Sequence, residues 1–232
     1  MPKQQPHPDE QQLILKMLSF ADDPEAFVMY VFPWGKPNSP LEGHDGPREW
    51  QLSALRQMKA HIAANRGKVR SGADPELMKL ARASGRGIGK SAFLAWVALW
   101  LFSCVPSSTV VVSANTEQQL KSTTFPEIRK WATMSIHSRW FKHNAMSLQP
   151  EEWLVETMKR TTDYDDAYWY IQARLWSEEA PDAYAGVHSQ TGMAVLFDEA
   201  SGIASCIWPV AQGYFTDKTI HRFWFCISNP RN

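Results

Sequence analysis

Apolar residues recur with two different spacings along the chain, and the spacing separates expected helices from expected strands. Segments with an apolar helical face predict helices at 13–20, 24–32, 48–64, 90–104, 116–133 and 204–213. Short apolar or β-branched runs predict strands at 77–83, 109–112, 153–156, 168–175, 193–197 and 223–227. Pro24, directly after two aspartates, marks the start of the second helix, and Pro126 predicts a kink in the fifth.

Helices that alternate with short apolar strands are typical of the α/β class, with a mostly parallel sheet and helices on both faces. We expect residues 1–46 to form a tail (1–12) and a helical lead-in, and residues 47–232 to form one domain. A Pro- and Gly-rich loop is predicted at 33–47 and a basic loop at 66–72. The uncharged stretch 91–113 is broken at Pro106, and neither half reaches the about 20 residues that span a bilayer, so no membrane contact is expected.

Composition narrows the class of protein further. Of the 232 residues, 44% are hydrophobic and 21% are charged, which excludes a wholly disordered or collagen-like chain. The formal net charge is zero, so any nucleic acid would have to be bound through local basic patches. The three cysteines, Cys104, Cys206 and Cys226, form no CxxC pair and lie in apolar runs, which favours buried thiols in a reducing cytosol over a zinc site or disulfides.

The most informative motif is Ser-Gly-Arg-Gly-Ile-Gly-Lys-Ser at 84–91, between a predicted strand and a predicted helix. Glycines there let backbone N–H groups turn inward, and the helix N-terminus adds positive potential, which together suit a phosphate. Lys90 is then expected to reach the β- and γ-phosphates, and the Ser91 hydroxyl to hold Mg²⁺. Ser84 stands where the usual motif has its first glycine, so an ordinary Gly-rich turn is the alternative.

Two acids follow the most apolar predicted strand, 193–197. Asp198 at the carboxyl end of a parallel strand can hold Mg²⁺ opposite Ser91, and Glu199 can take a proton from an attacking water. A solvated acidic turn is the alternative for this pair taken alone. Its occurrence about a hundred residues after Gly-Lys-Ser favours Mg²⁺-dependent hydrolysis of ATP.

A third strand, 223–227, ends in Ser228, Asn229 and Pro230. If this strand lies beside the first two, Ser228 and Asn229 can hydrogen-bond the γ-phosphate or the water and release it after hydrolysis. Asn-Pro is also a common turn signal, so a plain strand-end turn is equally consistent with this segment.

In this order, the three motifs resemble those of the large terminase subunit of tailed phages, the motor that packages DNA into capsids. The resemblance extends from about residue 34 to residue 232. Residues 196–203 are similar to the family's Walker B segment and its Ala-Ser-Gly continuation, and residues 228–230 to its coupling motif. Residues 47–51 resemble its adenine motif, 114–118 a helicase-like motif, and 185–188 the short signature before Walker B.

The resemblance implies a RecA-like P-loop NTPase of the additional-strand, catalytic-glutamate type, in which an added strand separates the two Walker strands. It implies ATP and Mg²⁺ as cofactors, Glu199, Lys90 and Arg86 as catalytic residues, with Arg86 sensing the γ-phosphate, and Ser91 and Asp198 as metal ligands. Gln51 would read the adenine edge beside Trp50. The expected nucleotide-binding set is Trp50, Gln51, Ser84, Gly85, Arg86, Gly87, Ile88, Gly89, Lys90, Ser91, Ala92, Ser228 and Asn229.

The partners that the resemblance implies are double-stranded DNA, a small terminase subunit, a portal protein and further copies of the chain in a ring, in the cytoplasm of a bacterial host that carries a phage or prophage. Family members also carry a nuclease domain with clustered acidic metal ligands. No such domain is expected here, and the acidic cluster Asp163, Asp165 and Asp166 is interpreted as a solvated turn, so we expect no nuclease activity.

Basic clusters are the expected DNA contacts, although charged runs usually form solvated faces. They comprise Arg66, Lys68 and Arg70, then Arg129 and Lys130, then Arg139 and Lys142. An arginine finger from a neighbouring copy is implied, with Arg129, Arg139 and Arg174 as candidates, while His188 is expected to be structural. Two alternatives stay open: a helicase-type nucleic-acid-dependent ATPase, which needs a second RecA-like domain, and an inactive nucleotide-binding prophage remnant.

Overall fold

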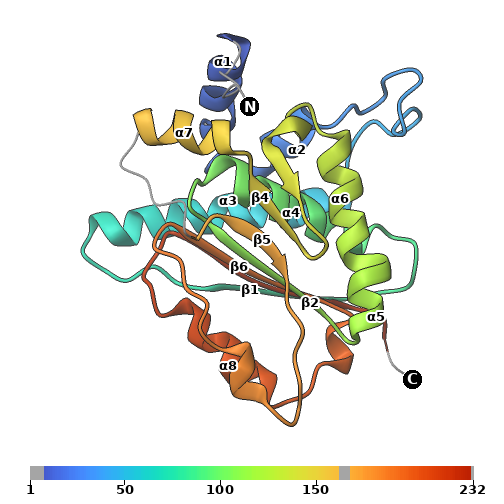
Figure 1. Cartoon of the computed structure of the whole chain (residues 1–232), viewed down its shortest axis with the longest axis vertical. Coiled ribbons are helices and arrows are strands. Elements are labelled where there is room, and N and C mark those ends of the chain that lie inside the picture. The colour runs from blue at the N-terminus through green and yellow to red at the C-terminus, as the bar shows by residue number, and fades with distance from the viewer. Residues whose placement is uncertain (1–7, 162–167, 231–232) are drawn as a thin grey trace.

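A seven-stranded sheet forms the centre of the computed structural model, which describes residues 8–161 and 168–230 (Figure 1). The strand order is β1-β7-β6-β2-β5-β4-β3, and β1, β7, β6, β2 and β5 run parallel while β4 and β3 are antiparallel. The strand bounds are β1 Met78–Ala83, β2 Thr109–Ala114, β3 Phe141–His143, β4 Ser147–Pro150, β5 Tyr170–Ala173, β6 Gly192–Asp198 and β7 His221–Ser228. The mostly parallel α/β sheet predicted from the alternating pattern is confirmed.

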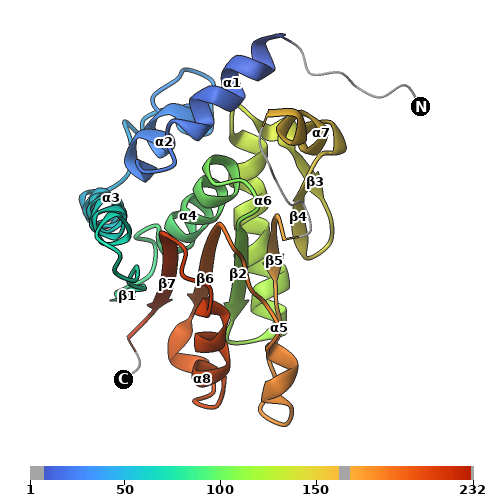
Figure 2. The same ribbon diagram turned by 90° about the vertical axis from the view of Figure 1, so that its left-hand side faces the viewer.

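Helices cover both faces of this sheet, as predicted (Figures 1 and 2). One face carries α3, α4 and α6, and the other carries α8 and short 3₁₀ turns. The helices are α1 Pro8–Leu18, α2 Pro24–Val31, α3 Glu49–Arg70, α4 Lys90–Cys104, α5 Glu117–Gln119, α6 Phe125–Met134, α7 Glu152–Thr161 and α8 Ile207–Gln212. A π-helical segment, η1 Leu120–Thr124, joins α5 to α6, and the 3₁₀ turns are η2 Ser138–Trp140, η3 Pro181–Tyr184, η4 Ala200–Gly202 and η5 Gly213–Phe215.

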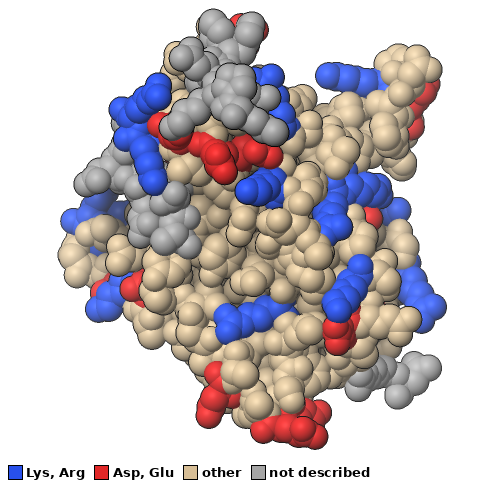
Figure 3. Space-filling view, viewed as in Figure 1, with Lys and Arg blue, Asp and Glu red and all other residues tan. Residues whose placement is uncertain are grey.

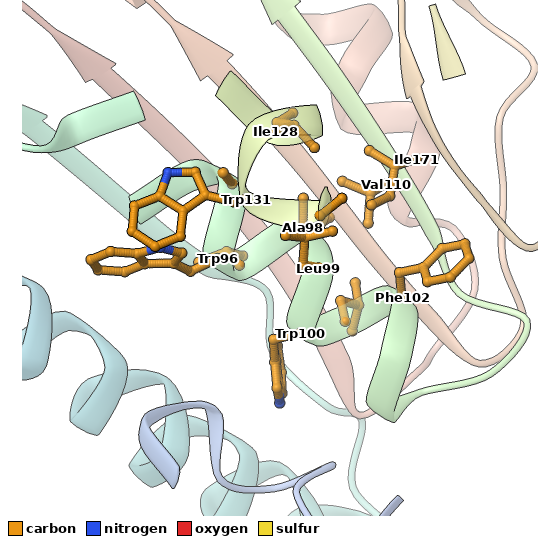
Figure 4. Close-up of a cluster of buried hydrophobic side chains, with 14 of the residues drawn as sticks. Trp96, Ala98, Leu99, Trp100, Phe102, Val110, Ile128, Trp131 and Ile171 are labelled. Atoms are coloured by element: carbon orange, nitrogen blue, oxygen red, sulfur yellow. The ribbon is translucent and has the colours of Figure 1, made fainter. Parts of the chain in front are cut away.

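Helix α4 is the centre of the core because it is apolar on every side (Figure 4). Trp96 packs edge-on against Trp131 of α6 at a ring distance of 5.0 Å, and Phe102 stacks on Trp169 at 5.1 Å. The Trp100 indole donates a hydrogen bond to Phe20 O at 2.9 Å, which ties the turn after α1 to α4. Each fully buried aromatic or aliphatic side chain contributes about 1.5–3 kcal/mol of apolar burial, so α4 places the loop before it on a firm support.

The lead-in helices pack on this same core. Asp23 caps α2 by accepting a hydrogen bond from Ala26 N at 3.1 Å, and Pro24 occupies the first turn, as the sequence predicted. Phe27, Val28 and Val31 are buried with α4 in one cluster. The boundary at residue 47 stays a prediction, and none of the described helices is long and apolar enough to cross a bilayer.

Several predicted segments differ in the structure, each for a local reason. The predicted tail is helical from Pro8, because Ile14 and Met17 of α1 are buried against the core. The predicted basic loop is instead the end of α3, which continues through Gly67 to Arg70, where Ser71 N–H donates to Gly67 O. The helix predicted at 116–133 is interrupted by the π-helical segment before Pro126.

The region 141–161 was predicted least well. The weak strand expected at 153–156 is wrong, because Trp153, Leu154 and Met158 lie buried on one face of helix α7. Strands β3 and β4 were not predicted, since each is four residues or shorter and β4 is fixed by pairing with β5. The strand predicted at 168–175 is present as the shorter β5.

Candidate active site

The carboxyl ends of β1, β7 and β6 meet at one edge of the sheet, which brings three distant loops together (Figure 2). Ala83 pairs with Ser228, and Phe197 pairs with Cys226, so the residues after each strand lie next to one another. Strand β7 lies between β1 and β6. Ligands of open parallel sheets bind at this kind of edge.

Lys90 is the first residue of α4, and its ammonium group points back into the Gly-rich loop. It is 8% exposed and donates hydrogen bonds to Ser84 O at 2.7 Å, Gly85 O at 2.8 Å and Asn229 Oδ1 at 2.8 Å. Gly89 has φ +83°, a left-handed conformation that glycine adopts without the cost of a side chain. The Lys90 ammonium group therefore lies at the N-terminus of α4, surrounded by oxygen acceptors.

Asp198 ends β6 and is 3% exposed. Its Oδ2 accepts hydrogen bonds from the hydroxyls of Thr124 at 2.7 Å and Ser91 at 3.3 Å, and its Oδ1 accepts one from Glu199 N at 3.1 Å. Burial raises the pKa of this carboxyl above its ordinary value, while the Thr124 hydrogen bond opposes that rise. A carboxylate beside a serine hydroxyl is an all-oxygen donor set, which fits Mg²⁺, so Asp198 and Ser91 are the residues that would hold this ion.

Glu199 has φ +49°, which is uncommon for a residue with a side chain. Its carboxylate turns toward the end of β7, where Oε2 accepts from Asn229 N at 3.2 Å and Ser228 Oγ at 3.3 Å. The Asn229 side-chain amide donates to Oε1 as well. Backbone strain of about 1–3 kcal/mol at such a position persists only where neighbouring contacts hold it, and here β7 supplies them.

A cavity of about 840 Å³ lies over these groups. Its wall combines the Gly-rich loop and the ends of β6 and β7 with one side of the α5–α6 region. The lining residues are Arg86, Gly87, Ile88, Gly89, Lys90, Ser91, Ala92, Asn115, Gln119, Thr123, Glu127, Asp198, Glu199, Ser201, Asn229 and Pro230. Most of the expected nucleotide-binding residues are therefore brought together, and Arg86 is exposed on this wall.

Trp50 and Gln51 lie behind the loop rather than on the cavity wall. Trp50 Nε1 donates to Ile88 O at 3.0 Å, and Gln51 Nε2 donates to Gly89 O at 2.9 Å. Gln51 is 2% exposed, and its Oε1 accepts from Arg48 N at 2.7 Å. These contacts place both side chains as supports of the loop, and the expected adenine contact stays a prediction.

Sequence reasoning did not single out several polar residues of the site, among them Thr124 and Glu127. Thr124 is 1% exposed and touches Asp198, and Glu127 lines the cavity from α6. Thr124 was visible as a hydroxyl inside the apolar stripe of the predicted helix, next to Leu120 and Ile128. The apolar stripe does not predict which group the hydroxyl contacts, because its partner, Asp198, is 74 residues away in the sequence.

Most of the expected DNA-contacting side chains have partners within the chain. Arg66 forms an ion pair with Asp22, and Lys68 forms one with Glu76. Lys130 Nζ lies 3.2 Å from Glu127 Oε1. Arg70 and Lys142 are exposed. On the face drawn in Figure 3, Lys and Arg lie at separate positions with acidic side chains among them rather than in one continuous patch.

The three candidate arginine fingers are also engaged. Arg129 donates to Asn144 O and Ala145 O. Arg139 forms an ion pair with Glu10 at 2.6 Å. Arg174 donates to Ala183 O at 3.0 Å and Ala185 O at 2.7 Å, which makes it a support of the segment before β6.

Two other predictions concern side chains outside the cavity. His188 is exposed and packs against Tyr168 at a ring distance of 4.7 Å, and its structural role stays a prediction. Asp163, Asp165 and Asp166 lie outside the described residues. Within 8–161 and 168–230, no group of three or more His, Cys, Asp or Glu residues is arranged to hold a metal ion.

No protein-family model matches the chain, and no curated protein matches it. Among solved structures, the chain is similar to the ATPase domain of the large terminase of Thermus phage P74-26, with 17% sequence identity and a TM-score of 0.44. That likeness covers 82% of this chain and 67% of the other.

Proposed function

We propose that this chain is an ATP-hydrolysing motor domain of the large-terminase type, which works on double-stranded DNA. The observation that carries the proposal is the meeting of Lys90, Asp198 and Glu199 on one cavity at the carboxyl edge of a parallel sheet. Lys90 comes from the Gly-rich loop and the two acids from the end of β6, and together they supply the charged groups that Mg²⁺-dependent hydrolysis of a nucleoside triphosphate uses.

Binding of the triphosphate would use the loop and the start of α4. The Lys90 ammonium would exchange the carbonyl oxygens of Ser84 and Gly85 for β- and γ-phosphate oxygens, with loop N–H groups and the helix N-terminus adding to the attraction. Ser91 and Asp198 would hold Mg²⁺, which supplies positive charge against the phosphate oxygens when it is bound. Arg86, exposed on the wall, would contact the γ-phosphate.

Hydrolysis would use Glu199 as the general base. Its carboxylate takes a proton from water, the water oxygen attacks the γ-phosphorus, and the bond to the bridging oxygen breaks to release ADP. Hydrogen bonds from Ser228 and Asn229 hold the carboxylate in place. Asn229 also accepts a hydrogen bond from Lys90. Movement of that lysine toward a phosphate would therefore change the hydrogen bonds that Asn229 makes to Glu199.

The finer assignments are part of the same proposal. Strand β7 between β1 and β6 supports the RecA-like, additional-strand type of P-loop NTPase for residues 47–232. The sequence motifs support a terminase motor of phage or prophage origin that acts in a bacterial cytoplasm. Its proposed partners are double-stranded DNA, a small terminase subunit, a portal protein and further copies of the chain in a ring, and Gln51 with Trp50 would lie toward the adenine.

The test is ATP hydrolysis by the purified chain, with and without Mg²⁺ and with and without double-stranded DNA. We expect Mg²⁺-dependent turnover that Lys90→Ala abolishes. The matched control is Lys218→Ala, which removes an exposed ammonium that pairs with Asp74 at 2.8 Å. Nucleotide binding without hydrolysis, even at high protein concentration, would contradict the motor and favour an inactive remnant, and stimulation by single-stranded nucleic acid alone would favour a helicase-type ATPase.

A further inference from the structure

Thr124 is a polar residue in an otherwise apolar row on the buried side of the α5–α6 region. Leu120, Thr124 and Ile128 are each 1% exposed and follow one another at helical spacing. A buried hydroxyl costs free energy unless it is hydrogen-bonded, so its partner indicates why it is there. Thr124 is also the last residue of the π-helical segment, a wide turn that often occurs at functional sites.

The partner of this hydroxyl is the carboxylate of Asp198. Thr124 Oγ1 donates to Asp198 Oδ2 at 2.7 Å, which is shorter than the 3.3 Å contact from Ser91 Oγ. The other oxygen, Oδ1, accepts from Glu199 N at 3.1 Å. Both oxygens of the Asp198 carboxylate therefore accept hydrogen bonds. These bonds fix the plane of the carboxylate and keep Oδ2 facing Ser91.

We propose that Thr124 is a positioning residue that fixes the Asp198 carboxylate in the orientation needed to hold the nucleotide's divalent cation. This inference rests on the proposed function and goes beyond it by assigning a role to a residue outside the recognised motifs. A hydroxyl that orients a ligating carboxylate affects metal affinity, and such outer contacts typically contribute about 10–100-fold.

The same segment has a second connection to the cavity. Gln119 before the π-helical segment, Thr123 within it and Glu127 after it line the cavity wall, while Thr124 faces the sheet beneath. The turn thus touches the metal-binding carboxylate on one side and the nucleotide cavity on the other. A displacement of α6 would reach Asp198 through Thr124.

The test measures the affinity for a non-hydrolysable ATP analogue twice, with excess Mg²⁺ and with EDTA. The dissociation constant in EDTA divided by the dissociation constant in Mg²⁺ reports how much the metal contributes to binding, independently of turnover. We expect Thr124→Val to reduce this ratio by about tenfold while the affinity in EDTA stays unchanged. Thr124→Ser, which keeps the hydroxyl, should restore most of the ratio.

Thr157→Val is the matched control, because Thr157 is a buried helical threonine whose hydroxyl donates to Trp153 O at 2.7 Å in α7. It should leave the ratio at the wild-type value. If Thr124→Val does not fold, as judged by thermal unfolding, Thr124→Cys replaces the hydroxyl by a thiol, which is only a weak donor, and is expected to lower the ratio.

A ratio equal to that of the wild type in a folded Thr124→Val or Thr124→Cys protein would overturn the inference and leave Thr124 a purely structural residue. Failure of the proposed function has a different signature, since the wild-type chain itself would then show no Mg²⁺-dependent nucleotide binding. In an Asp198→Asn background, Thr124→Val should change the ratio no further, because the carboxylate through which it acts is absent.

Discussion

The backbone N–H of Asn229 donates to Glu199 Oε2 at 3.2 Å, and its side-chain amide donates to the other oxygen of the same carboxylate. The side-chain oxygen of Asn229 accepts from Lys90 at 2.8 Å. One amide therefore joins the proposed phosphate-binding cation to the proposed general base. Any substitution that removes the amide should disturb the base without removing the cation.

Asn229→Leu keeps the approximate size of the side chain and removes its hydrogen bonds. We expect kcat for ATP hydrolysis to fall by about tenfold to hundredfold, because the Glu199 carboxylate loses an orienting donor, while the dissociation constant for ATP changes much less. Steady-state kinetics and equilibrium nucleotide binding separate the two effects. Asn144→Leu, an exposed amide on the β3–β4 turn, should change neither, and an equal loss of binding in Asn229→Leu would contradict the assignment.

Glu199→Gln tests the base itself. The amide cannot accept the proton of the water, so we expect a loss of about 10²–10⁴ in the hydrolysis rate with ATP binding retained. The measurement is single-turnover release of phosphate alongside equilibrium binding of ATP. Glu178→Gln, at an exposed loop position, is the control. Normal turnover by Glu199→Gln would remove Glu199 from the mechanism.

A substitution of Gln51 distinguishes two roles for its side chain, which are reading the adenine edge and supporting the Gly-rich loop. Its buried amide donates to Gly89 O at 2.9 Å, so Gln51→Leu should loosen the loop and weaken ATP and GTP alike, by about tenfold for a lost buried hydrogen bond of 1.5 kcal/mol. Competition binding with the two nucleotides checks this. Selective loss of ATP affinity would instead show that Gln51 reads the base, as the family resemblance implies.

His137 predicts how stability depends on pH. It is fully buried among Phe27, Trp140 and Phe141, and burial lowers its pKa from 6.5 to about 3. The unfolded chain therefore takes up a proton near pH 6.5 that the folded chain refuses, so the free energy of unfolding falls as pH decreases from about 6.5 toward 3. Between pH 7 and pH 5 the loss from this group alone is about 2 kcal/mol.

The measurement is denaturant unfolding at pH 7 and pH 5 for the wild type and for a His137→Phe, Ser103→Ala double variant. Ser103 is changed as well because its hydroxyl lies 2.8 Å from His137 Nε2 and would otherwise be left without that partner. The double variant should lose about 2 kcal/mol less than the wild type between the two pH values. An identical loss in both proteins would mean that His137 accepts a proton in the folded state.

Elements with a strong local signal were predicted correctly. The apolar runs that became β2, β6 and β7 are buried from both faces, which leaves a nearly continuous apolar sequence, and α4 is buried on every side. Elements stabilised by distant partners were predicted poorly. Strand β4 depends on pairing with β5, and the buried face of α7 becomes evident only over its ten residues.

The candidate site divides in the same way. By themselves, the residues of the chain determined which groups can do chemistry: a lysine after a Gly-rich turn, two acids after one strand and an amide after another, because these signals lie within a few neighbouring residues. Only the tertiary structure decided that β7 lies between β1 and β6, that Asn229 joins Lys90 to Glu199, and that Thr124 holds Asp198. Those relationships depend on strand order and helix packing. Thr124 and Asp198 are 74 residues apart in the sequence, and Lys90 and Asn229 are 139 residues apart, so no local pattern indicates that these side chains meet.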